Sequence, residues 1–139
     1  MKRYRWLLFV FIIGILSACQ NKERIMEKNI SVKLKEQIDN PHGFKFVSMQ
    51  IEKTFSVAER KEIITEDKLL EVAHLFGESD ILNQYRTEFN FLQAQTDESS
   101  DAVYYVQCII EEVNDQGTRT NIYDVTVLND AHLSVMYIH

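Results

Sequence analysis

The sequence predicts an α+β fold, in which an antiparallel sheet of about four strands has helices packed on one face. Two observations support this class. Near the N-terminus, apolar residues recur every four positions, as they do along one side of a helix. In the last third of the chain, apolar and polar residues alternate over three segments with short turns between them. Such a meander commonly buries one face, so the helices are expected to cover that face.

The first helix is expected over about 24–38, because its apolar residues form one stripe: Met26, Ile30, Leu34 and Ile38. Pro41 and Gly43 follow it, and proline cannot continue the hydrogen-bond ladder of a helix. A strand with alternating apolar and polar residues is expected next, over 44–55.

The middle of the chain predicts further helices. Ser56 and Glu59 have the spacing of a capping box, although the segment that follows is ambiguous up to residue 64. Thr65 begins a helix that Gly77 ends, and Ser79 or Asp80 begins another. The expected buried faces are Leu69, Val72, Ala73 and Phe76 in the first, and Ile81, Leu82, Tyr85, Phe89 and Leu92 in the second. Residues 96–101 form a polar acidic loop.

Three strands are expected in the C-terminal third, with turns at 114–117 and 129–130. Their inward-facing rows are Tyr104, Val106, Cys108 and Ile110, then Tyr123, Val125 and Val127, and finally Leu133, Val135 and Tyr137.

The N-terminus has the organisation of an export signal. Three basic residues within the first five precede an apolar run over 6–16, and Ser17 and Ala18 then lead to Cys19. The run has about 11 residues, fewer than the roughly 20 that a membrane-spanning helix needs. Polar residues follow from Gln20 onward.

Leu16-Ser17-Ala18-Cys19 resembles the lipobox of bacterial lipoproteins. The resemblance implies a signal peptide over 1–18, cleavage before Cys19, and a diacylglycerol thioether with fatty acyl chains such as palmitate on that cysteine. The lipid bilayer would then be a partner, since two or more acyl chains anchor a protein firmly. An uncleaved N-terminal helix and a secretory signal cut elsewhere are the alternatives.

This interpretation divides the chain into a signal peptide (1–18), the lipidated cysteine with a short tether (19–23), and one globular domain (24–139). The resemblance implies a cell-envelope location. Gln20 after the cysteine favours the outer membrane in a diderm, and Lys22-Glu23-Arg24 lacks the acidic pair of surface-exported lipoproteins, which favours the periplasmic face. Residues 39–49 also resemble small uncharacterised lipoproteins of the Bacteroidetes type, a likeness that implies no activity.

The charge balance excludes one class of partner. Residues 1–18 hold three of the 15 basic residues and none of the 21 acidic ones, so the remaining 121 residues carry a net charge of −9. An acidic domain repels nucleic acid, and no nucleic-acid partner is expected.

No catalytic residue, metal or cofactor is predicted. Cys108 is the only thiol besides Cys19, and its place on an apolar strand face favours a core residue over a nucleophile. No metal-ligand spacing joins the four histidines, which are His42, His74, His132 and His139. The many carboxylates are typical of a solvated acidic surface.

The sheet face that points away from the inward rows is the predicted interaction surface. Its apolar side chains are Tyr105, Ile109, Ile122, Leu128 and Met136. If this face is open, it forms an apolar patch that could bind a protein or a small ligand. The alternative is that helices or the strand at 44–55 cover it.

These observations favour a non-enzymatic binding module on a membrane anchor. Two alternatives stay open: a small envelope hydrolase that uses carboxylates and a histidine, and an inhibitor or immunity-like lipoprotein that its acidic charge steers to a basic partner.

Overall fold

The structure, a computed structural model, describes residues 21–139. The predicted signal peptide and Cys19 lie outside the described residues. Among those described, no helix has both the length and the apolar character needed to cross a membrane.

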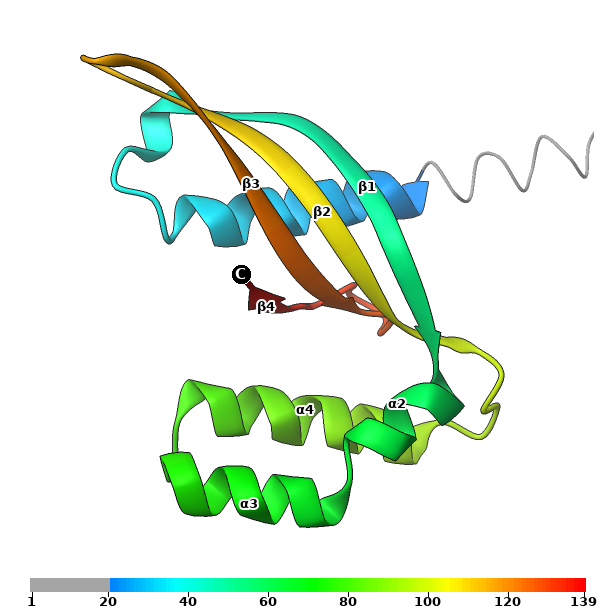
Figure 1. The fold of residues 1–139 in the computed structure, drawn as a ribbon. Coiled ribbons are helices and arrows are strands. Elements are labelled where there is room, and N and C mark those ends of the chain that lie inside the picture. Colours follow the sequence, from blue (N-terminus) through cyan, green and yellow to red (C-terminus); the bar gives the residue numbers. More distant parts are fainter. Residues whose placement is uncertain (1–20) are drawn as a thin grey trace, which may run out of the picture.

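One antiparallel sheet with the strand order β1-β2-β3-β4 organises the domain, and helices precede it and interrupt it (Figure 1). This confirms the α+β class and the four antiparallel strands. A helix over 21–35 comes first. The other elements are η1 (Pro41–Gly43), β1 (Phe44–Ser56), α2 (Val57–Ile63), α3 (Glu66–Phe76), α4 (Asp80–Ala94), β2 (Asp101–Asn114), β3 (Gly117–Leu128) and β4 (Val135–Ile138).

The N-terminal helix covers one face of the sheet. Three of the four residues of its predicted stripe, Met26, Ile30 and Leu34, are fully buried. The helix ends at residue 35, before the predicted end at about 38, so Ile38 lies beyond it and is only partly buried. The three buried residues pack against the inward rows of the strands, which include Tyr104, Val106, Cys108, Ile110, Val125 and Val127. This apolar contact forms the larger part of the core.

The helix includes residues that the prediction assigned to the tether. Residues 21–23 are already helical, whereas the prediction assigned 19–23 to a tether and started the domain at residue 24. These residues are polar because they lie on the solvent side of the helix and at its rim. There Lys22 donates a hydrogen bond to the hydroxyl of Tyr104.

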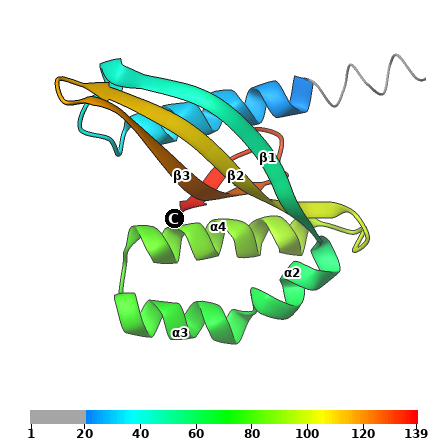
Figure 2. The same ribbon diagram turned by 45° about the horizontal axis from the view of Figure 1, so that its top comes forward.

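The three helices between β1 and β2 lie at one end of the sheet. Side chains of α2 and α4 pack there against strand residues on the face opposite the N-terminal helix, and α3 packs on α4. A second cluster joins Leu92 of α4 to Val103, Leu128 and Met136 of the strands. Figure 2 shows the sheet between the N-terminal helix and α4. The predicted helix-covered face is therefore the one under the N-terminal helix, and α4 covers part of the other face.

The predicted caps place these helices. Ser56 and Glu59 form a capping box at α2, and the side chains of Thr65 and Ser79 cap α3 and α4. Gly77 ends α3 with a φ of 59°, a conformation that favours glycine.

Two residues predicted to be buried in these helices are exposed. They are Phe76 at the end of α3 and Ile81 at the start of α4. The reason is that α3 packs on α4 and has no extensive contact with the sheet, so only its central Val72 becomes buried.

The last strand is shorter than predicted. Leu133 is buried but lies in a turn with a φ of 51°, before β4 begins. The register shifts between Thr126 and Val127, which pair with Tyr137 and Val135, so Met136 is an extra residue in a bulge. The bulge places Tyr137 on the α4 side of the sheet, although Val135 points to the N-terminal helix.

Candidate functional site

The sheet face opposite the N-terminal helix is open along the middle of β1, β2 and β3. Ile109 of β2 and Ile122 of β3 are direct cross-strand partners there, with Ser48 of β1 beside them. Ile122 is 61% exposed, and Ile109 is partly exposed. Two of the predicted surface residues therefore form an accessible apolar pair.

Polar rows border this pair on both sides. On one side, Gln107 Nε2 donates a hydrogen bond to Asp124 Oδ1 at 3.3 Å. On the other, Lys45 Nζ lies 3.2 Å from Glu111 Oε2. Tyr105 is exposed on the same face but lies beyond the Gln107–Asp124 row. The structure thus gives a banded surface in place of one apolar patch.

The other two predicted surface residues are not on the surface, and this part of the prediction is wrong. Leu128 is 1% exposed and Met136 is 5% exposed. Both lie in the cluster under Leu92 of α4. The alternative that helices cover the face is correct at this end of the sheet. The sequence could not show it, because nothing in a strand's alternation tells which helix packs on which face.

A hollow of about 370 Å³ opens at the boundary between the open face and the covered end. Its lining combines carboxylates, a histidine, a hydroxyl and an aromatic ring, from Glu52, Tyr105, Val106, Asp124, Val125, Thr126 and His139. Asp124 and His139 are held together by two backbone hydrogen bonds, at 3.0 and 2.8 Å. β4 therefore brings His139 to the rim of the hollow.

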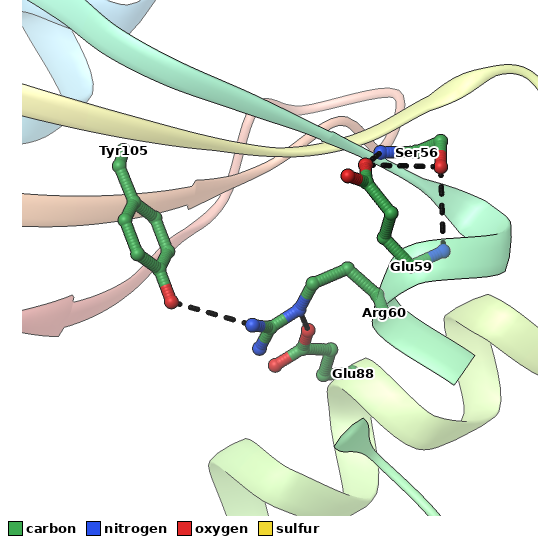
Figure 3. Close-up of polar contacts among 5 residues, drawn as sticks. All are labelled: Ser56, Glu59, Arg60, Glu88 and Tyr105. Atoms are coloured by element: carbon green, nitrogen blue, oxygen red, sulfur yellow. Dashed lines mark hydrogen bonds and ion pairs between the residues drawn. The ribbon is translucent and has the colours of Figure 1, made fainter. Parts of the chain in front are cut away.

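A buried ion pair supports the wall of this hollow (Figure 3). Arg60 Nε of α2 donates to Glu88 Oε1 of α4 at 2.7 Å, and Arg60 Nη1 donates to the Tyr105 hydroxyl at 3.3 Å. Arg60 is 5% exposed and Glu88 is fully buried. The pair links two helices to the sheet and fixes the hydroxyl end of Tyr105, while the Phe55 ring packs 4.6 Å from the Tyr105 ring.

The capping box next to Arg60 sets its direction. The Ser56 N–H donates to Glu59 Oε2 at 2.7 Å, and the Glu59 N–H donates to Ser56 Oγ at 3.3 Å. These bonds begin α2 directly at the end of β1. The next residue of the first turn, Arg60, then points inward, toward α4 and the sheet (Figure 3).

Charge and burial change the proton affinities of these groups. Burial alone would lower the pKa of Arg60, but the hydrogen bond and the charge of Glu88 outweigh it and raise the pKa. Burial, followed by the nearby Glu88 carboxylate, raises the pKa of Tyr137 well above its usual value. Arg60 therefore stays a cation and Tyr137 stays a neutral phenol. Glu88 Oε2 and the Tyr137 hydroxyl are both buried without a hydrogen-bond partner among the described residues.

Sequence reasoning missed Arg60 and Glu88. Their spacing carried a signal, because Arg60 lies between the buried Val57 and Ile64 at helical intervals. Glu88 likewise falls on the Leu82–Leu92 face of α4. Two opposite charges, each on the otherwise apolar face of its helix, indicate that the two residues form a buried ion pair.

Cys108 lies in the core, as predicted. It is fully buried, and burial together with the charge of Asp124 raises the pKa of its thiol to about 12. His42 lies in η1 and His74 in α3, whereas His132 precedes β4 and His139 follows it. In the described part of the chain no three metal-ligating side chains come together.

Exposed apolar side chains also occur on the helical layer. The largest exposed fractions there belong to Leu70, Leu75 and Phe76 of α3. They lie at separate positions around α3, and the sequence analysis did not propose any of them as a surface residue.

Comparison with known proteins gives no match: no family model, no curated protein and no solved structure is significantly similar to this chain.

Proposed function

We propose that this chain is a lipid-anchored lipoprotein of the bacterial envelope, whose domain is a non-enzymatic binding module. The observation that carries the anchor is the lipobox Leu16-Ser17-Ala18-Cys19 after a short apolar run. Only Gln20 separates Cys19 from the described helix. A lipid on Cys19 would therefore hold the domain close to the bilayer, on the periplasmic face of the outer membrane in a diderm.

The binding role rests on the open sheet face. The adjacent side chains of Ile109 and Ile122 expose apolar area between polar rows, and such a pattern is typical of the centre and rim of a modest interface. The ion pair of Arg60 and Glu88 keeps the neighbouring Tyr105 in place. A rigid surface loses little entropy when it binds.

The anchor is tested with Cys19→Ala, expressed in a bacterial host with intact lipoprotein processing. The variant should accumulate as an uncleaved precursor that incorporates no labelled palmitate, because the thiol that takes the lipid is gone. Cys108→Ala removes the only other cysteine and should leave processing and labelling unchanged. Cleavage and labelling of Cys19→Ala at the normal level would refute the lipoprotein assignment.

The binding surface is tested by cross-linking in intact envelopes, followed by capture of the tagged protein. The double variant Ile109→Ser/Ile122→Ser should lose a discrete cross-linked partner that the wild type retains. Leu75→Ser removes an equally exposed apolar side chain from α3 and should keep the partner. Loss of the partner with Leu75→Ser alone would move the site to the helical layer.

The hollow favours a hydrolase as the second candidate. Asp124 and His139 both line it and are joined through their backbones, with Glu52 beside them. Carboxylates and a histidine in one concavity are the groups of general acid–base catalysis. Turnover of chromogenic ester or glycoside substrates by the wild type, abolished by His139→Ala and Asp124→Asn, would favour this function over binding.

A further inference from the structure

The outer edge of β4 offers a second possible binding surface. β4 is the terminal strand of the sheet, and no strand pairs with its other edge in the part of the chain that the structure describes. Asp124 and His139 exchange both of their backbone hydrogen bonds, so the adjacent Ile138 directs its N–H and C=O away from β3. Those groups face a groove.

The groove runs along β4 between two helical walls and has a volume of about 670 Å³. The N-terminal helix contributes one wall, with Lys33, Glu36 and Gln37, and α4 contributes the other, with Asp80, Asn83, Gln84 and Thr87. Figure 1 shows β4 and the C-terminal end between these two helices. The floor of the groove is thus a strand edge, and its walls are polar.

The two edge strands of the sheet, β1 and β4, differ in the features that would prevent another strand from pairing with them. β1 carries three register irregularities and the charged residues Lys45 and Lys53, and both features discourage the addition of a strand. β4 has the sequence Val-Met-Tyr-Ile, with no charge and no proline. Its shortness, one bulge and the flanking helices restrict access to its edge but leave room for a single extended chain. Of the two edges, β4 is therefore the one to which an additional strand can pair.

We propose that this groove binds an extended, basic segment of a partner polypeptide, which adds to β4 as a fifth strand. Only a strand offers N–H and C=O groups at the spacing of an edge, so the backbone chemistry selects this conformation. Side chains of an added strand would alternate between the N-terminal helix and α4, because successive residues of a strand point to opposite faces. The proposal does not depend on lipid anchoring or on the Ile109–Ile122 surface.

The charge of the walls selects basic side chains. Lys33 is already paired with Glu36 at 3.1 Å, whereas Asp80 has no ion-pair partner among residues 21–139. The net charge of −9 on residues 19–139 adds a long-range attraction for a basic segment. A second copy of this chain is disfavoured, because its own β4 lies between the same walls and the helices of the two copies would meet before the strands.

The test is to select binders for the full-length chain in detergent micelles from a phage library of random nine-residue linear peptides. The most enriched peptide is then synthesised. We expect enriched sequences with alternating β-branched and basic residues. The bound peptide should slow the exchange of the Ile138 amide hydrogen, since a new backbone hydrogen bond would protect it.

Ile138→Pro removes the outward N–H without removing a bond to β3, and proline is tolerated on an outward-facing edge. This variant should weaken the peptide at least tenfold, and Ile138→Val should not. Thr87→Arg places bulk and positive charge in the groove and should also weaken binding at least tenfold. Asn90→Arg makes the same change on α4 outside the groove lining and should leave the affinity within about twofold.

Three results would overturn the proposal. One is a library that yields no peptide above background. Another is a peptide that binds Ile138→Pro and Thr87→Arg as tightly as the wild type, which would place it elsewhere on the molecule. The third is a concentration-dependent dimer in sedimentation that Ile138→Pro dissociates, which would make a second copy the occupant.

Discussion

At the scale of single residues, the buried ion pair between Arg60 and Glu88 is the contact whose disruption should destabilise the domain most. Removing one partner leaves the other charge buried and unpaired, which typically costs about 3–5 kcal/mol. We therefore expect Glu88→Leu and Arg60→Met each to lower the free energy of unfolding by about that amount in urea denaturation. The double variant Arg60→Met/Glu88→Leu should recover most of the loss, because apolar side chains of similar volume can replace a buried pair.

This double-mutant cycle distinguishes a structural pair from a collection of separate contacts. If the losses of the two single variants simply add in the double variant, Arg60 and Glu88 are not coupled, and the 2.7 Å contact contributes little to stability. Tyr105→Phe, which removes only the hydroxyl that accepts from Arg60, serves as a milder reference with an expected cost of about 1 kcal/mol.

Cys108 gives a second prediction at this scale. A rise of its pKa from 9.0 to about 12 reduces the thiolate fraction near pH 8 about a thousandfold, and the side chain is also fully buried. We expect a thiol reagent such as DTNB to react with Cys108 at least about a thousandfold more slowly in the folded domain than in the denatured chain. Rapid reaction under native conditions would show that β2 opens locally.

At the scale of elements, the start of α2 can be tested through its cap. Ser56→Ala removes one bond of the capping box and should destabilise the domain by about 1 kcal/mol in chemical denaturation. Ser48→Ala, at an exposed strand position, is the control and should change stability by less than about 0.5 kcal/mol. An equal effect of the two substitutions would contradict a role for the cap.

The same cap has a defined pH dependence. The backbone and side-chain hydrogen bonds from Ser56 lower the pKa of Glu59 below its usual 4.5. The folded state therefore binds this proton less readily than the unfolded state does. The contribution of Glu59 is present above the unfolded pKa and is lost as the pH falls through the lower pKa of the folded state.

The elements that local patterns define were predictable, and the contacts between distant elements were not. The buried stripe of Met26, Ile30 and Leu34 and the caps at Ser56, Thr65 and Ser79 depend on neighbours in sequence. The burial of Leu128 and Met136 depends on where α4 packs, which strand alternation does not encode. The exposure of Phe76 follows similarly from α3 packing only on α4.

The candidate site likewise contains a part that the sequence predicted and a part that it did not. Strand alternation placed Tyr105, Ile109 and Ile122 on the face opposite the N-terminal helix, and all three are accessible there. The pair Arg60–Glu88 joins residues 28 apart, and each one alone resembles an ordinary charge on a helix. Only the coincidence of both on apolar faces indicates that they meet.

At the scale of the whole molecule, a lipid on Cys19 would limit how far the domain can lie from a membrane, because Cys19 precedes the first described residue by only two positions. Two residues of extended chain span at most about 7 Å, and four residues of helix add about 6 Å. Ile25 would then lie close to the lipid surface. In Figures 1 and 2, α3 lies in the layer farthest from the N-terminal helix, with the sheet and α4 between them.

This geometry predicts different distances to the bilayer for two exposed positions. Ile25→Cys and Leu75→Cys, each labelled with a donor fluorophore on the lipidated protein in vesicles, should transfer energy to lipid-bound acceptors with higher efficiency from position 25. Cys108 can stay in place, because burial and its raised pKa keep it unlabelled. The same two labelled variants, made from a chain that begins at Gln20 and so carries neither the lipid nor the apolar run over 6–16, should show only background transfer. Equal transfer from both positions in the lipidated protein would mean that the domain lies on its side, with the helical layer against the membrane, so that Leu75 and Phe76 of α3 would contact lipid.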